Sequence, residues 1–101
     1  MAKLIERDTQ DGAYGMTAER MIITTESGQR VLLMQQFGGL NSMAGGAYRY
    51  RHGLALAVSE RDTLASLDAE YARTGIPIAH MRDVLEWDGA TIERVAMSAK
   101  G

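Results

Sequence analysis

The sequence contains no cysteine, one proline and two histidines in 101 residues. Without cysteine the chain has no disulfide bonds, no thiol nucleophile and no thiolate ligands for zinc, and it suits a reducing compartment. The single proline and the 46% share of hydrophobic residues argue against a disordered linker. We therefore expect one folded domain over residues 1–101 with a single core.

The chain also lacks an excess of charge and a long apolar run. Eleven Lys and Arg residues and 13 Asp and Glu residues give a net charge of -2, so no overall field attracts the protein to nucleic acid or to an anionic membrane. No apolar run approaches the roughly 18 residues of a membrane span, and the N-terminal segment becomes charged before a signal-peptide core could form. We expect a soluble, cytoplasmic protein that binds no membrane.

Residues with catalytic or metal-binding chemistry are few and scattered. His52 and His80 are the only histidines, and neither a His-x-x-x-His nor an Asp-x-Asp spacing occurs, so we predict no metal and no cofactor. The serines lie in turn, cap, helix or tail positions without a nucleophile-elbow pattern. The sequence therefore favours a non-enzymatic protein. A small-molecule enzyme that uses His52 as acid or base is a further interpretation, and it needs a carboxylate partner from a distant part of the chain.

Two apolar, β-favouring runs around a short turn predict a hairpin over residues 21–34. With a two-residue turn at Ser27 and Gly28, Ile23 pairs with Leu32. Both faces of the hairpin are then largely apolar, so both need a cover. We expect a helix over one face and a second copy of the chain over the other, which predicts a homodimer.

The segment over residues 47–58 predicts a strand with two unlike faces. Because side chains alternate across a strand, its aromatic and its arginine residues point opposite ways. Stacking on nucleic acid needs rings beside cations, so this split favours a covered aromatic face behind a solvated basic face. A nucleic-acid-binding regulator that uses the arginines, with Arg82 as a further contact, is the alternative. The aromatic face carries Tyr48, Tyr50, His52, Leu54, Leu56 and Val58, and the basic face carries Arg49 and Arg51.

Helical spacing of apolar residues predicts an amphipathic helix over residues 60–74. Leu64, Leu67 and Tyr71 form one apolar stripe, and Ser59 stands in the N-cap position. A stripe of this kind packs against a single surface. We therefore expect the helix to cover one face of the sheet.

The last quarter of the chain fits two structures. The Asp88-Gly89 pair is a strong hairpin signal, and pairing around it places Leu85 opposite Ile92. Residues 78–98 also fit helical spacing behind a first-turn proline, so a helical alternative stays open. The hairpin is favoured because the turn residues and the cross-strand pairs agree with each other.

Paired glycines between the first hairpin and the 47–58 strand predict a flexible or tightly turned loop. The loop lacks the Gly-Lys-Ser/Thr ending of phosphate-binding loops, and a strand rather than a helix follows it. Contact with a protein partner is therefore the expected role of this region. The predicted partner-binding residues are Phe37, Leu40, Met43, Arg49 and Arg51.

These patterns together predict an α+β fold with an antiparallel sheet of five or six strands and one helix packed on one face, in the order β-β-β-β-α-β-β. The first strand is expected over residues 2–7. The predicted function is a small non-enzymatic binding protein that acts through protein–protein contacts and forms a homodimer.

Overall fold

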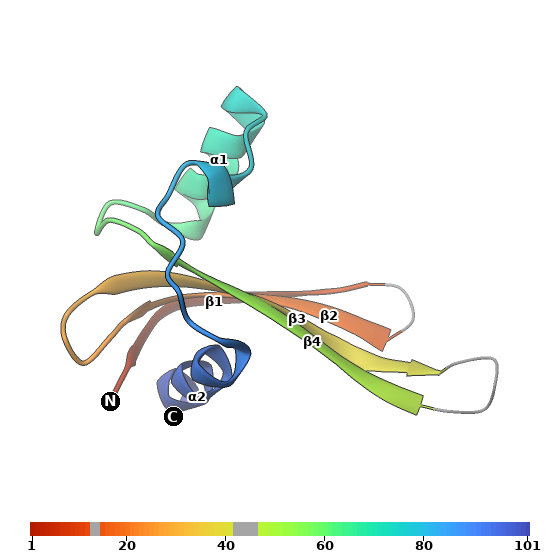
Figure 1. Ribbon diagram of the computed structural model, residues 1–101. Coiled ribbons are helices and arrows are strands. Elements are labelled where there is room, and N and C mark those ends of the chain that lie inside the picture. The colour runs from red at the N-terminus through yellow and green to blue at the C-terminus, as the bar shows by residue number, and fades with distance from the viewer. Residues whose placement is uncertain (13–14, 42–46) are drawn as a thin grey trace.

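The computed structural model describes residues 1–12, 15–41 and 47–101, and it describes positions 39–41 and 47–51 by their backbone alone. The chain forms a four-stranded antiparallel sheet in the order β1-β2-β3-β4, with one helix on each face (Figure 1). The predicted α+β class is confirmed. The strands are β1 (Lys3–Asp11), β2 (Met16–Thr24), β3 (Arg30–Asn41) and β4 (Ala47–Ala57).

β2 and β3 form the predicted hairpin, but their register differs by one residue from the predicted one. Ile23 pairs with Val31. The turn is longer than two residues, because Thr25 N–H donates to the carbonyl of Gln29 at 2.8 Å and Gly28 adopts a positive φ of 89°. A three-residue loop with glycine in the left-handed region therefore replaces the two-residue turn.

Both faces of this hairpin are apolar, as predicted, but the chain covers both of them itself. One face packs against α2 (Gly89–Lys100), and the other packs against α1 (Leu64–Thr74). A second copy is therefore not needed as a cover, and the homodimer prediction loses this basis. The sheet residues under α2 are Met21, Ile23, Val31, Leu33 and Ala55, and those under α1 are Ile22, Leu32 and Leu56.

The hairpin predicted around Asp88 and Gly89 is wrong, because these two residues begin α2. The side chain of Asp88 caps the helix, with Oδ1 accepting from the N–H of Thr91 at 2.7 Å. The buried residues of α2 are Ile92, Ala96 and Ala99. They recur at helical spacing, so burying one helix face outweighs the turn signal. The described chain thus has four strands instead of five or six, and two α-helices instead of one.

The segment between the two helices runs past the outer edge of β4. Pro77 precedes a single 3-10 turn, η2 (Ile78–His80). Residues 83–85 then pair antiparallel with the C-terminal end of β4 through two backbone hydrogen bonds of 2.8 Å. The chain crosses in this way from the α1 face of the sheet to the α2 face.

The helix predicted over residues 60–74 is confirmed, but α1 begins at Leu64. Thr63 is the N-cap and forms a capping box with Ser66, whose N–H donates to Thr63 Oγ1 at 3.0 Å. Ser59, the predicted cap, lies in the preceding turn, where its N–H donates to the Asp62 carboxylate at 2.9 Å. The reciprocal hydrogen bonds of the capping box therefore set where the helix begins.

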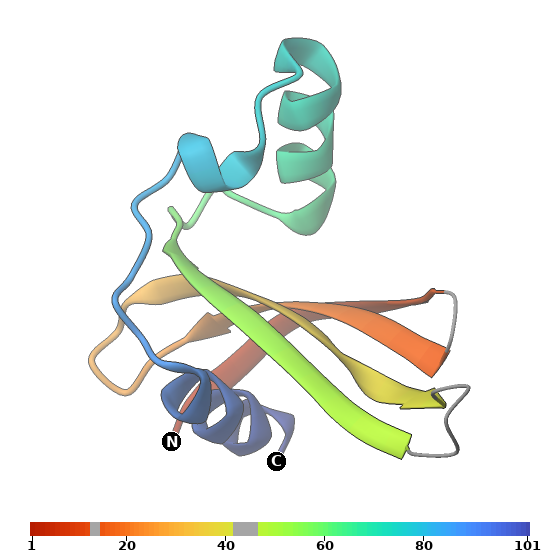
Figure 2. The same ribbon diagram turned by 45° about the vertical axis from the view of Figure 1, so that its right-hand side comes forward.

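The apolar stripe of α1 is buried only along its first half. Leu64 and Leu67 lie in the core, whereas Tyr71 is 52% exposed. The reason is the direction of α1, which rises away from the sheet toward its C-terminal end (Figure 2). Burial of Tyr71 was therefore wrongly predicted from a correct helical stripe.

The sheet is longer than the helices that cover it. Its far half, where β1 and β3 end and β2 and β4 begin, extends beyond both α1 and α2 (Figures 1 and 2). The molecule is accordingly elongated, with dimensions of 46 × 34 × 22 Å. Neither helix covers the far half of the sheet, so its surface is open to a partner.

Candidate functional site

Four of the five predicted partner-binding residues, Phe37, Leu40, Arg49 and Arg51, belong to this far half, and the structure describes them unequally. Phe37 is half-buried in β3, opposite the backbone of Arg51 in β4. The backbone places Leu40 in β3 and Arg49 in β4, directly opposite Tyr48 and Gly39 respectively. The side chains of Leu40, Arg49 and Arg51, and the whole of Met43, lie outside the described part of the chain.

Cross-strand rows on the α1 face of the sheet change from apolar to polar with distance from the helix. Directly opposed residues share a face, so one residue from each strand makes up a row. The row under α1 is Glu6, Ile22, Leu32 and Leu56, and the next is Asp8, Arg20, Met34 and Leu54. The third row, which we call the open row, is Gln10, Ala18, Gln36 and His52.

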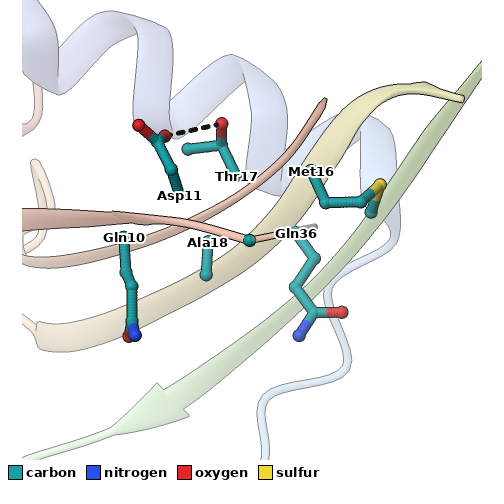
Figure 3. Close-up of a pocket in the computed structure, with 7 residues that line it drawn as sticks. Gln10, Asp11, Met16, Thr17, Ala18 and Gln36 are labelled. Atoms are coloured by element: carbon teal, nitrogen blue, oxygen red, sulfur yellow. Dashed lines mark hydrogen bonds between the residues drawn. The ribbon is translucent and has the colours of Figure 1, made fainter. Parts of the chain in front are cut away.

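The side chains of the open row leave the sheet on one side. Gln10, Ala18 and Gln36 extend in the same direction from three neighbouring strands (Figure 3). Asp11 and Thr17 point to the opposite face, where the Thr17 hydroxyl donates to Asp11 Oδ1 at 3.3 Å. Gln10, Gln36 and His52 are exposed and Ala18 is half-buried, so the row presents a polar surface with a low point at the alanine.

Three hollows meet at Ala18. One of about 290 Å³ lies along the ends of β1 and β2, and one of about 480 Å³ is lined by Arg20 and by Asp68 of α1. The third, of about 470 Å³, reaches His52. All three are lined in part by Ala18, and together we call them the α1-side cleft.

Arg20 of β2 links the sheet to α1 at the α1-side cleft. Its Nε donates to Asp8 Oδ1 at 3.0 Å, and its NH1 donates to Asp68 Oδ1 at 2.5 Å. The hydrogen bonds to Asp8 and Asp68 raise the pKa of Arg20, and the bond from Arg20 lowers the pKa of Asp68. Arg20 is thus committed to two carboxylates, which leaves one net negative charge at this corner.

The opposite face of the sheet is tied to α2 through a buried carboxylate. Glu19 has no exposed side-chain surface; Arg7 Nε donates to its Oε2 at 2.8 Å, and the Lys100 ammonium lies 2.9 Å from its Oε1. Burial acts to raise the pKa of Glu19, but hydrogen bonds from Lys100 and Arg7 together lower it. Glu19 is therefore ionised and anchors the end of α2.

Arg82, the further contact of the nucleic-acid alternative, is engaged within the protein. Its NH2 lies 2.8 Å from Glu70 Oε2 and 3.1 Å from Asp62 Oδ1. The hydrogen bond from Arg82 lowers the pKa of Asp62. A guanidinium held between two carboxylates offers little positive potential to a phosphate. Arg82 connects the segment after α1 to the middle of that helix and to the turn before it.

His52 lies at the β4 end of the open row, directly opposite Gln36. Other neighbours in the cleft are the half-buried Met34 and Leu54. In the described part of the chain no hydrogen bond or ion pair links His52 to a carboxylate, and no group of three or more His, Asp or Glu side chains could hold a metal ion. At this exposed position the ring nitrogens of His52 can form hydrogen bonds with a partner.

Sequence reasoning missed Gln10, Ala18 and Gln36, because each lies on a different strand and the row exists only once three registers are known. The available signal was weak. Gln36 follows an apolar run in the sequence, which showed where that run ends but not what lies beside it.

No helix in the ranges that the structure covers is both long and apolar enough to cross a membrane. Neither a family model, nor a curated protein, nor a solved structure matches the chain.

Proposed function

We propose that this is a non-enzymatic binding protein that acts through protein–protein contacts and forms a homodimer through the α1-side cleft. The observation that carries the proposal is a sheet that extends past both helices and presents a row of amide and imidazole groups. Uncovered sheet surface of this kind is a common site of protein contact.

The chemistry of the open row suits a polypeptide better than a polyanion. The glutamine side chains at positions 10 and 36 can each donate and accept hydrogen bonds, as backbone and side-chain groups of a protein partner require. At the corner of the cleft, Asp8 and Asp68 outweigh Arg20 by one negative charge. This charge balance does not favour phosphate groups.

A second copy of the chain is the partner that this surface fits. In a two-fold symmetric interface the same surface of both copies is used. If residue i of one copy contacts residue j of the other, then residue j of the first copy also contacts residue i of the second. Amides suit such an arrangement, because Gln10 or Gln36 can pair with an identical group without charge repulsion. Packing the rows together would also remove the half-buried Met34 and Leu54 from water.

Sedimentation and light scattering over a wide concentration range test the homodimer. We expect the wild-type protein to reach twice the 11.0 kDa mass of the chain. Ala18→Arg should remain a monomer, because a long side chain at the low point of the interface keeps the two copies apart. Met97→Arg is the matched control, since Met97 is 63% exposed on α2, away from the cleft, and should dimerise as the wild type does.

A wild-type protein that stays at the mass of one chain at every concentration would contradict the homodimer. If Ala18→Arg dimerises as well as the wild type, the interface lies elsewhere. Circular dichroism of each variant shows whether it folds, so that loss of the dimer is not confused with loss of the fold.

A further inference from the structure

The two outer strands of the sheet differ in how well they are protected against pairing with another strand. β1 has a register shift between Leu4 and Glu6, and five of its nine residues are charged. Bulges and charges are features by which proteins block an edge. β4 pairs with β3 without a register shift from Ala47 to Ala57, and it contains no proline. β4 is therefore the edge that can accept a further strand.

The chain itself already pairs with one end of this edge. Residues 83–85 bind there through the carbonyl of Ala55 and the N–H of Ala57. Backbone groups alternate in direction along a strand, so the N–H and C=O groups of every second residue of β4 point away from β3, as those of Ala55 and Ala57 do. The other outward positions include Arg49, Arg51 and Gly53. In the part of the chain that the structure describes, no segment pairs with the edge at these three positions.

We propose that this free part of the β4 edge binds an extended polypeptide segment with acidic residues at alternate positions, as a fifth strand of the sheet. The proposal rests on the proposed function, because it names a class of protein partner. Positions 49 and 51 lie two residues apart and so belong to one face of the sheet. An antiparallel strand with Asp or Glu opposite both arginines would form two opposite-charge cross-strand pairs in addition to its backbone hydrogen bonds.

A second copy of β4 would meet like charges in the registers centred on the two arginines. Two-fold antiparallel pairing keeps each residue on its own face, so odd positions pair only with odd positions. A register centred on position 50 sets Arg49 against Arg51 twice, and one centred on position 51 sets Arg51 against itself. Like charges directly opposite are destabilising, so in these registers the edge favours an acidic strand over a second copy of β4.

Binding is tested by fluorescence anisotropy with a labelled peptide of about eight alternating Glu and Val residues, a length typical of a strand. The full chain at physiological salt should bind it. A peptide with Lys in place of Glu should bind at least about tenfold more weakly, because both charge pairs become repulsive.

N-methylated peptides separate strand pairing from simple charge attraction. In the proposed register the N–H groups of the glutamates face β4, because they lie opposite the outward positions of the edge. Methylation at the glutamates should weaken binding by at least about tenfold, since it removes several backbone hydrogen bonds and leaves the charge unchanged. Methylation at the valines is the matched control and should leave binding unchanged.

Charge reversal in the protein completes the test. Arg49→Glu/Arg51→Glu should lose the acidic peptide and gain the Lys peptide. Arg61→Glu/Arg73→Glu changes the net charge equally at two exposed positions away from β4 and should bind as the wild type does. Ala18→Arg should also bind normally, so failure of the homodimer and failure of this inference are distinguishable.

Three results would overturn the inference. One is no binding of the acidic peptide by the folded wild-type chain, and another is equal binding of the Glu-methylated and Val-methylated peptides. The third is tighter binding of a single-stranded oligonucleotide that is lost in Arg49→Glu/Arg51→Glu, which would assign the arginines to nucleic acid instead.

Discussion

At the scale of single residues, Glu19 is the position where burial and charge oppose each other most strongly. A buried carboxylate is costly unless it is paired, and Arg7 and Lys100 both pair with it. Lys100 lies in the last turn of α2, so this one carboxylate links β1, β2 and the C-terminal helix. Sequence inspection gives no sign of this role, because Glu19 stands in an ordinary strand context.

Glu19→Gln should lower the free energy of unfolding by roughly 1–3 kcal/mol, because charge-assisted hydrogen bonds in a buried site are replaced by weaker ones. Urea denaturation followed by circular dichroism measures the change. Glu86→Gln is the control, since Glu86 is exposed, and it should leave the unfolding midpoint unchanged. Equal stability of Glu19→Gln and the wild type would contradict the anchoring role.

Stability should also fall on acidification. The folded-state pKa of Glu19 lies below its ordinary value of 4.5, and that of Asp62 lies below 3.8. The stability that such groups contribute is present above the ordinary pKa and is lost as the pH falls through the folded-state value. Urea unfolding between pH 7 and about 2 should show this loss, and a Glu19→Gln/Asp62→Asn variant should show less of it. Stability that stays constant or rises toward low pH would contradict the ion-pair assignments.

At the scale of elements, α2 shows how one dipeptide serves two structures. Asp-Gly is a frequent hairpin turn, and aspartate is also a preferred helix N-cap. The apolar residues that follow Asp88 decide between the two, because they recur at helical spacing and find an uncovered face of the sheet. The local signal was correctly noticed, and the choice between its two meanings required the tertiary structure.

Gly89→Pro distinguishes the two structures by experiment. Gly89 is the first residue of α2, and its side-chain position is open, so proline should be tolerated there with stability unchanged or raised by up to about 1 kcal/mol. Proline at the second turn position of a hairpin would instead destabilise it. Thermal unfolding measures the effect, and Ala96→Pro, inside the same helix, should be strongly destabilising.

The predictable parts of the fold were those that local sequence patterns determine. The hairpin over residues 21–34 and the helix over 60–74 were both found, because each has a clear apolar period. The exact register of the hairpin was missed, because the turn length depends on the left-handed conformation of Gly28. The start of the helix was missed because both Ser59 and Thr63 can act as an N-cap. The open row could not be predicted, since it requires four strands in register and a helix that rises away from them.

At the scale of the whole molecule, the two helices cover opposite faces of the same half of the sheet and leave the other half uncovered (Figure 1). The core is therefore concentrated at one end. We expect amide hydrogen exchange to be slowest in the β2 and β3 residues under the helices, such as Ile22 and Leu32, and faster in the far half. Dimer formation through the α1-side cleft should slow amide exchange in the far half as protein concentration rises. In Ala18→Arg, exchange in the far half should not depend on protein concentration.

The crossing of residues 83–85 over the end of β4 has a consequence for ligand choice. A strand added along Arg49 and Arg51 would meet this crossing just beyond Gly53 and could lengthen only toward Ala47. Residues 83–85 would thus fix where one end of the bound peptide lies, as the closed end of a groove does. Discrimination among acidic segments would then depend on the residue that abuts the barrier, where a bulky side chain would be rejected.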